Sequence, residues 1–116
     1  MIQAAPFEIH SELGADGGRV MLTGELDIAS VPQVEEVVQS LLAKRASRLV
    51  IDLSGLTFID SSGLRMLIGL NDRAEQEGWT LALLRPAEPS LSVFQITGAS
   101  QVLNIYAGEQ DALLSF

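Results

Sequence analysis

The chain has 116 residues, of which 47% are hydrophobic and 19% charged, and its 7 basic and 15 acidic side chains give a net charge of −8. This composition excludes a disordered chain, and the length fits one compact domain over residues 1–116. Because cysteine is absent and His10 is the single histidine, disulfides, thiol nucleophiles, thiolate zinc sites and histidine-rich metal sites are also excluded.

The acidic residues are spread along the chain rather than gathered in a tail. Their field repels phosphate backbones, so we expect no direct binding to nucleic acid. The first eight residues lack the basic start and long apolar stretch of a signal peptide, and no apolar run approaches the roughly 18 residues of a membrane span. We therefore expect a cytoplasmic protein without a membrane span, present as a monomer or weak dimer.

The amino-terminal third predicts a β-hairpin followed by a helix. Residues 7–13 alternate apolar and polar side chains, as in a half-exposed strand near a sheet edge, and a glycine-rich turn leads into a more buried strand at 19–23. Ser30, Pro32 and Gln33 predict a helix start, with Ser30 as the N-cap and Gln33 as its capping-box partner.

The middle third predicts a strand, a loop and a helix. The run Leu49–Leu53 is short, apolar and β-branched, as expected for a central strand covered on both faces. Residues 54–59 are predicted to form a loop. It leads into a helix that begins at Asp60–Gly63 and ends at Gly78.

The last third predicts a strand at 79–84, a short helix after Pro89-Ser90, a strand at Val102–Tyr106 and a helical turn at Gly108–Leu114. From the second strand onward, strands alternate with helices, which favours parallel pairing through right-handed crossovers. We therefore predict an α/β fold in which a mixed, mostly parallel β-sheet packs with about four helices.

Two predicted strand-to-helix loops, Gly24–Asp27 and Asp60–Ser62, should lie side by side at the edge where open α/β sheets bind ligands. In the stretch Asp60-Ser61-Ser62-Gly63, Asp or Ser can cap a helix and glycine lets the helix approach the sheet. An exposed hydroxyl at Ser61 could also be phosphorylated, which would add about −1.5 to −2 charges beside Asp60.

Enzyme signatures are missing from the sequence. Lys44, the single lysine, is not part of a phosphate-binding loop, no G-x-G-x-x-G follows a strand, and a phosphoacceptor receiver domain would need a lysine after the last strand. A nucleophile elbow around Ser61 would need glycine where Ile59 stands, and nothing in the sequence brings His10 to Ser61 as a base. We expect a protein that is not an enzyme and that uses no cofactor or metal.

The stretch Leu53–Leu64, which contains Asp-Ser-Ser-Gly-Leu, resembles the signature loop and helix start of STAS domains, specifically those of bacterial anti-sigma factor antagonists. Leu22–Asp27 is similar to a second stretch typical of that family, and the Thr97-Gly98 turn fits a third. The resemblance extends from Phe7 to Leu114 with matching element order.

The resemblance implies a partner-switching protein. In the family, the unphosphorylated antagonist binds an anti-sigma factor, often a serine kinase with a histidine-kinase-like ATPase fold, and so frees a sigma factor. The kinase phosphorylates the serine directly after the Asp, here Ser61, with Ser62 as the less favoured acceptor, and a serine phosphatase resets the switch. The partner-binding residues it implies are Gly24, Glu25, Leu26, Asp27, Asp60, Ser61, Ser62, Gly63 and Leu64. An alternative is a STAS adaptor subunit of a larger signalling or transport complex.

Overall fold

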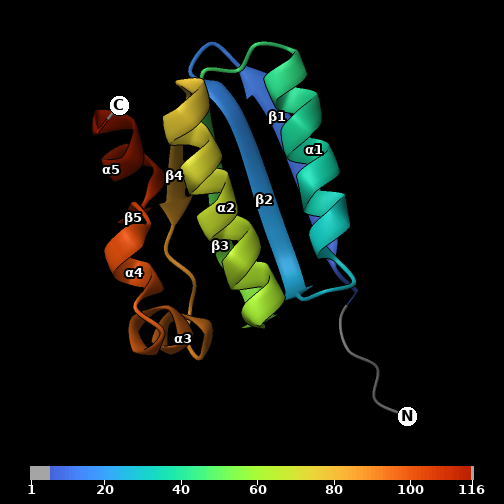
Figure 1. Ribbon diagram of the computed structural model, residues 1–116, viewed down its shortest axis with the longest axis vertical. Coiled ribbons are helices and arrows are strands. Elements are labelled where there is room, and N and C mark those ends of the chain that lie inside the picture. The colour runs from blue at the N-terminus through green and yellow to red at the C-terminus, as the bar shows by residue number, and fades with distance from the viewer. Residues whose placement is uncertain (1–5, 116) are drawn as a thin grey trace.

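In the described part of the chain, five strands form one sheet in the order β1-β2-β3-β4-β5, which is also their order along the chain (Figure 1). The edge strand β1 (Glu8–Gly14) pairs antiparallel with β2 (Gly17–Leu26), and the remaining neighbours pair in parallel: β3 (Arg48–Ile59), β4 (Thr80–Leu84) and β5 (Ile105–Tyr106). The prediction of a mixed, mostly parallel sheet with an amino-terminal hairpin is confirmed. The computed structural model describes residues 6–115, so the amino-terminal residues considered for a signal peptide lie partly outside the described residues.

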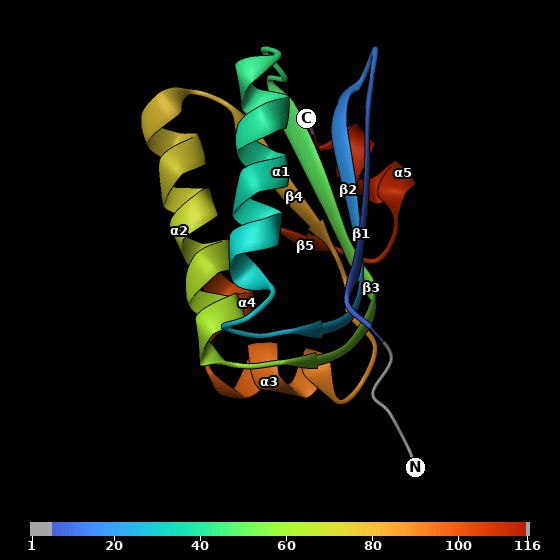
Figure 2. The ribbon, with the colours of Figure 1, turned by 90° about the vertical axis from the view of Figure 1, so that its right-hand side faces the viewer.

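Helices cover both faces of the sheet. The two long helices, α1 (Val31–Ala43) and α2 (Ser61–Glu77), lie on one face, and the short α5 (Glu109–Leu114) lies on the other (Figure 2). The main core includes Ile51 of β3, whereas Val50 belongs to a second, smaller core that contains Ala112 of α5. The central strand β3 is therefore buried on both faces, as its apolar run predicts. No helix among residues 6–115 is long and apolar enough to cross a membrane.

The strands β2 and β3 extend further than the sequence pattern predicts. Residues 24–26 and 54–59, which we expected to form loops, belong to β2 and β3, and Glu25 pairs with Phe58 and Leu26 with Ile59. The pairing register shifts between Met21 and Thr23 and again between Gly24 and Glu25. Such irregularities bend strands, and the ends of β2 and β3 turn beneath the amino-terminal ends of α1 and α2 (Figure 2).

The carboxy-terminal quarter contains one more helix than expected. After α3 (Ser90–Ile96), Gly98 takes a left-handed conformation with φ of 81°, and α4 (Ala99–Val102) begins directly after it. Val102 therefore belongs to α4, and the predicted strand Val102–Tyr106 shortens to the two residues of β5. The described residues form five helices rather than about four.

Candidate functional site

The amino-terminal end of α2 is joined to the end of β2 through Asp60. Its carboxylate accepts a hydrogen bond from the Gly63 amide at 3.0 Å, as an N-cap does, and its own amide donates to the Leu26 carbonyl at 3.1 Å. The predicted proximity of residues 24–27 and 60–62 is therefore present in the structure. We call residues 24–28 and 58–64 together the carboxyl edge.

Gly63 lets α2 pack directly against the end of the sheet. A Cβ atom at this position would lie 2.9 Å from the Ile59 side chain and 2.9 Å from both the side chain and the carbonyl oxygen of Leu26. Real Cβ atoms essentially never approach this closely, so only glycine fits. The close approach expected from the sequence is confirmed, and it determines where the residues before Gly63 lie relative to β2.

The predicted site residues divide into surface and interior positions. Glu25 and Ser61 are exposed, and Asp27, Asp60 and Ser62 are partly exposed. The other four are buried and shape the carboxyl edge from beneath rather than forming its surface: Gly24, Leu26, Gly63 and Leu64.

The Ser61 hydroxyl is an accessible oxygen of this edge. Ser61 is the first residue of α2, its side chain is exposed, and the structure gives its hydroxyl no hydrogen-bond partner among the described residues. Because the Asp60 side chain already caps the helix, the Ser61 hydroxyl is not needed as a cap. It is therefore open to chemical modification without loss of a hydrogen bond.

The turn between β2 and α1 is held by Asp27 and Ser30. The Asp27 carboxylate accepts hydrogen bonds from the amides of Ala29 and Ser30 at 3.0 and 3.1 Å. The buried Ser30 hydroxyl accepts from the Asp27 amide at 2.9 Å and donates to the Glu25 carbonyl at 2.9 Å. The predicted capping box is therefore wrong: the Ser30 hydroxyl makes no helix-capping bond because it is used within the preceding turn.

These bonds predict different effects of two neighbouring acidic residues on stability. We expect Asp27→Ala to lower the free energy of unfolding by about 1–2 kcal/mol, because two backbone amides lose a charged acceptor. Glu25→Ala, at an exposed side chain for which the structure gives no hydrogen bond, should change it by less than about 0.5 kcal/mol. Urea denaturation of both variants tests this difference, and equal losses would contradict it.

Sequence reasoning missed two exposed apolar side chains at the carboxyl edge. Ile28, in the turn before α1, is 75% exposed, and Phe58, near the end of β3, is 47% exposed. Phe58 lies in the predicted loop 54–59 and Ile28 directly follows the predicted loop Gly24–Asp27, where the sequence shows no hydrophobic periodicity to single them out. Interfaces between proteins place apolar side chains at the centre of a polar rim, an arrangement that these two side chains and their polar neighbours can form.

The structure does not bring His10 to Ser61. His10 pairs with Met21 on the exposed edge strand, whereas Ser61 follows Ile59, which pairs with Leu26. The five residue-to-residue steps from Met21 to Leu26 correspond to about 16 Å of strand at roughly 3.3 Å per step. A serine nucleophile activated by this histidine is therefore not assembled. Among residues 6–115, no group of three or more His, Asp or Glu side chains could hold a metal ion.

Comparison with known proteins agrees with this architecture. The family model described as "Mlab, STAS domain" matches residues 9–105. An anti-sigma-B factor antagonist from Staphylococcus epidermidis is 28% identical over 91 residues, which cover 78% of this chain and 84% of that protein.

Two solved structures show the same fold. A crystal structure of an anti-sigma factor antagonist from Mycobacterium paratuberculosis matches with a TM-score of 0.84 at 24% identity and covers 97% of both chains. The Bacillus protein SpoIIAA in its phosphorylated form matches with a TM-score of 0.67 at 24% identity, covering 95% of this chain and 98% of that one. The family model matches most of this chain, and the fold and the Asp-Ser-Ser-Gly helix start agree with that match. The chain therefore belongs to the STAS domain family.

Proposed function

We propose that this STAS domain is an anti-sigma factor antagonist whose partner binding is controlled by phosphorylation of Ser61. Unphosphorylated, it binds an anti-sigma factor of the serine-kinase type, with a histidine-kinase-like ATPase fold, and so frees a sigma factor. Phosphorylation of Ser61 by that kinase releases the complex, and a serine phosphatase restores the binding form. The observation that carries the proposal is the exposed Ser61 hydroxyl, free of hydrogen bonds within the described chain, at the start of α2.

The names of similar proteins support the antagonist function. The relative from Staphylococcus epidermidis is an anti-sigma-B factor antagonist, and SpoIIAA has been solved in a phosphorylated form. A phosphate is therefore compatible with this fold. In this chain, Asp60 and Gly63 hold the helix start in place without using the Ser61 side chain.

The proposed binding surface is the carboxyl edge. Its polar members are Glu25, Asp27, Asp60, Ser61 and Ser62, and its apolar members are the exposed Ile28 and Phe58. An interface of this kind buries apolar contacts at its centre and surrounds them with polar groups. A phosphate on Ser61 would introduce about −1.5 to −2 charges into that surface.

Phosphate mapping tests the proposal. The protein is first used to capture partners from an extract of its own host, and a captured serine kinase is then purified and incubated with it and ATP. We expect mass spectrometry to place one phosphate on Ser61, and Ser61→Ala to remain unmodified. In Ser62→Ala, which keeps the Ser61 hydroxyl, the phosphate should again map to Ser61. Phosphorylation of Ser61→Ala at the normal rate would refute the site.

Light scattering on the captured complex separates the antagonist from the adaptor function. An antagonist is expected to release its partner after incubation with ATP. Assembly into a large complex that phosphorylation does not dissociate would instead indicate an adaptor subunit, and would contradict the proposed switch.

A further inference from the structure

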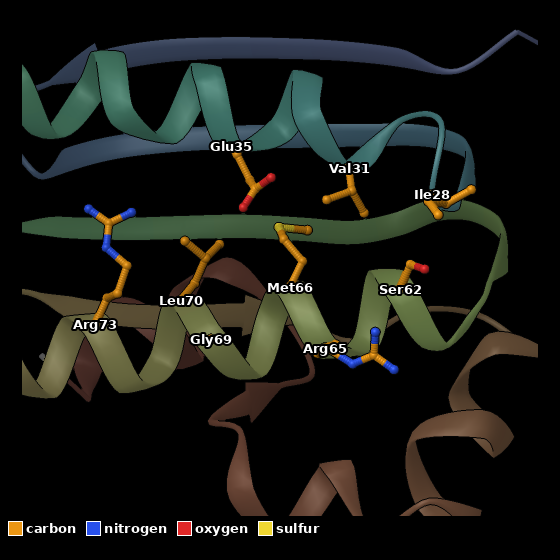
Figure 3. A pocket seen from close by; sticks show the side chains of 9 residues that line it. All are labelled: Ile28, Val31, Glu35, Ser62, Arg65, Met66, Gly69, Leu70 and Arg73. Carbon is orange, nitrogen blue, oxygen red and sulfur yellow. The ribbon is translucent and has the colours of Figure 1, made fainter.

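A groove of about 590 Å³ lies between α1 and α2 and begins beside Ser62 (Figure 3). Its lining is mostly apolar: Val31 projects from α1, and Met66 and Leu70 project from α2 toward the space between the helices, with the exposed Ile28 at the same end as Ser62. An open apolar groove of this kind on a small domain is typical of a binding surface.

The two ends of the groove differ. At the far end, the Arg73 guanidinium donates to Gln39 of α1 at 3.2 Å and to Glu77 of α2 at 3.2 Å, which closes the space between the helices. The hydrogen bond from Arg73, together with one from the Trp79 indole, lowers the pKa of Glu77. The end beside Ser62 has no such bridge in the described structure. The groove is therefore continuous with the carboxyl edge.

Gly69 lies in the lining at the middle of α2, where glycine is disfavoured relative to alanine. A Cβ atom at this position would meet nothing within 4 Å, unlike the Cβ at Gly63. The described fold therefore gives no packing reason for glycine here. Close approach of a partner backbone to α2 at Gly69 would explain the glycine, because the absence of a side chain leaves room for that backbone.

Arg65 supplies charge at the open end. Its side chain is exposed, has no hydrogen bond or ion pair within residues 6–115, and extends toward the amino-terminal end of α2 (Figure 3). In a chain of net charge −8, it presents a positive group to an acidic side chain of a partner. Ser61 stands four residues before Arg65, so a phosphate on Ser61 would compete with that acidic group for Arg65.

We propose that this groove receives an amphipathic helix of the anti-sigma factor, with its backbone closest at Gly69 and an acidic side chain at Arg65. The inference rests on the proposed function because it takes the anti-sigma factor as the occupant. From Ser62 to Arg73 the groove runs about 16 Å along α2, at roughly 1.5 Å per residue, which accommodates about three helical turns. Apolar side chains on one face of that helix would contact the exposed Ile28 and the half-buried Val31 above the largely buried Met66 and Leu70.

Filling the groove tests this inference. The probe is the purified serine kinase that phosphorylates Ser61, and binding is measured by isothermal titration calorimetry. We expect Gly69→Leu to weaken binding roughly tenfold or more, because its side chain occupies space reserved for the partner. Gly69→Ala should weaken binding less while leaving the fold intact. The control Glu75→Leu adds the same side chain at an exposed α2 position outside the groove, and should bind like the parent protein.

A charge test complements the packing test. We expect Arg65→Glu to weaken binding by roughly tenfold and to reduce its dependence on salt concentration, since an attractive pair becomes repulsive. Unchanged affinity in Gly69→Leu would overturn the groove as the docking site, and unchanged affinity in Arg65→Glu would overturn the acidic contact at Arg65.

The outcomes separate this inference from the proposed function. If Ser61→Asp loses binding but Gly69→Leu retains it, the groove inference fails and the phosphorylation switch stands. If no serine kinase binds the parent protein, the proposed function fails, and the groove inference falls with it. If light scattering shows that the free protein is a dimer that Gly69→Leu dissociates, a second copy occupies the groove and the inference is overturned.

Discussion

Ser61→Asp is expected to weaken binding to the anti-sigma factor by about a hundredfold. Two unit charges about 5 Å apart at an effective dielectric constant near 20 interact by about 3 kcal/mol, and each 1.4 kcal/mol is roughly a tenfold change in affinity. The α2 dipole favours an anion at this position by only about 0.3–1 kcal/mol, and it does so in the free and bound protein alike. Repulsion in the interface should therefore determine the result.

Isothermal titration calorimetry on the purified kinase measures this effect, and Ser61→Asn is the matched control. Asn has nearly the same size as Asp but no charge, so it should bind almost as tightly as the parent protein. The melting temperature of Ser61→Asp should stay close to that of the parent, because Ser61 is exposed and Asp60 remains the cap. An equal loss in Ser61→Asn and Ser61→Asp would show that space, rather than charge, controls binding.

Gly63→Ala is expected to lower the free energy of unfolding by about 1–2 kcal/mol. The added methyl would lie 2.9 Å from the Leu26 carbonyl oxygen. That carbonyl cannot move away without breaking its hydrogen bond from the Asp60 amide. Overpacking of this kind costs about 1–3 kcal/mol, and the intrinsic preference of helices for alanine offsets roughly 0.5–1 kcal/mol of it.

The same helix provides the control for this prediction. Gly69→Ala places a methyl where nothing lies within 4 Å, so it should raise the free energy of unfolding by about 0.5–1 kcal/mol. Urea denaturation with unchanged m-values would show that both variants act on the folded state. If Gly63→Ala is as stable as Gly69→Ala, the close packing of α2 against the end of β2 is not required.

Local sequence patterns predicted most elements of the fold correctly. The alternation in residues 7–13, the apolar run Leu49–Leu53 and the helix limits at Asp60 and Gly78 all depend on residues that are near one another in the chain. The same is true of the Asp-Ser-Ser-Gly stretch that carries the family resemblance. Periodicity and capping are properties of a few consecutive residues, so the sequence alone displays them.

The incorrect predictions concern residues whose pairing partner is distant in the chain, and a side chain that can form either of two local hydrogen bonds. Residues 24–26 and 54–59 have the composition of loops, but each supplies the other with a strand partner more than 30 positions away. Ser30 has the position of a helix cap, yet its hydroxyl bonds to the turn that precedes the helix. Neither the strand pairing nor the hydrogen bonding of Ser30 can be predicted without the three-dimensional arrangement.

The sequence by itself therefore determined the order of elements, the central position of β3 and the location of the Asp60–Gly63 helix start. Only the tertiary structure decided that the Ser61 hydroxyl is exposed, that Leu26, Gly63 and Leu64 are buried, and that a groove lies between α1 and α2. Exposure and grooves depend on how separate elements pack against one another, and that packing is set by contacts between residues far apart in the chain.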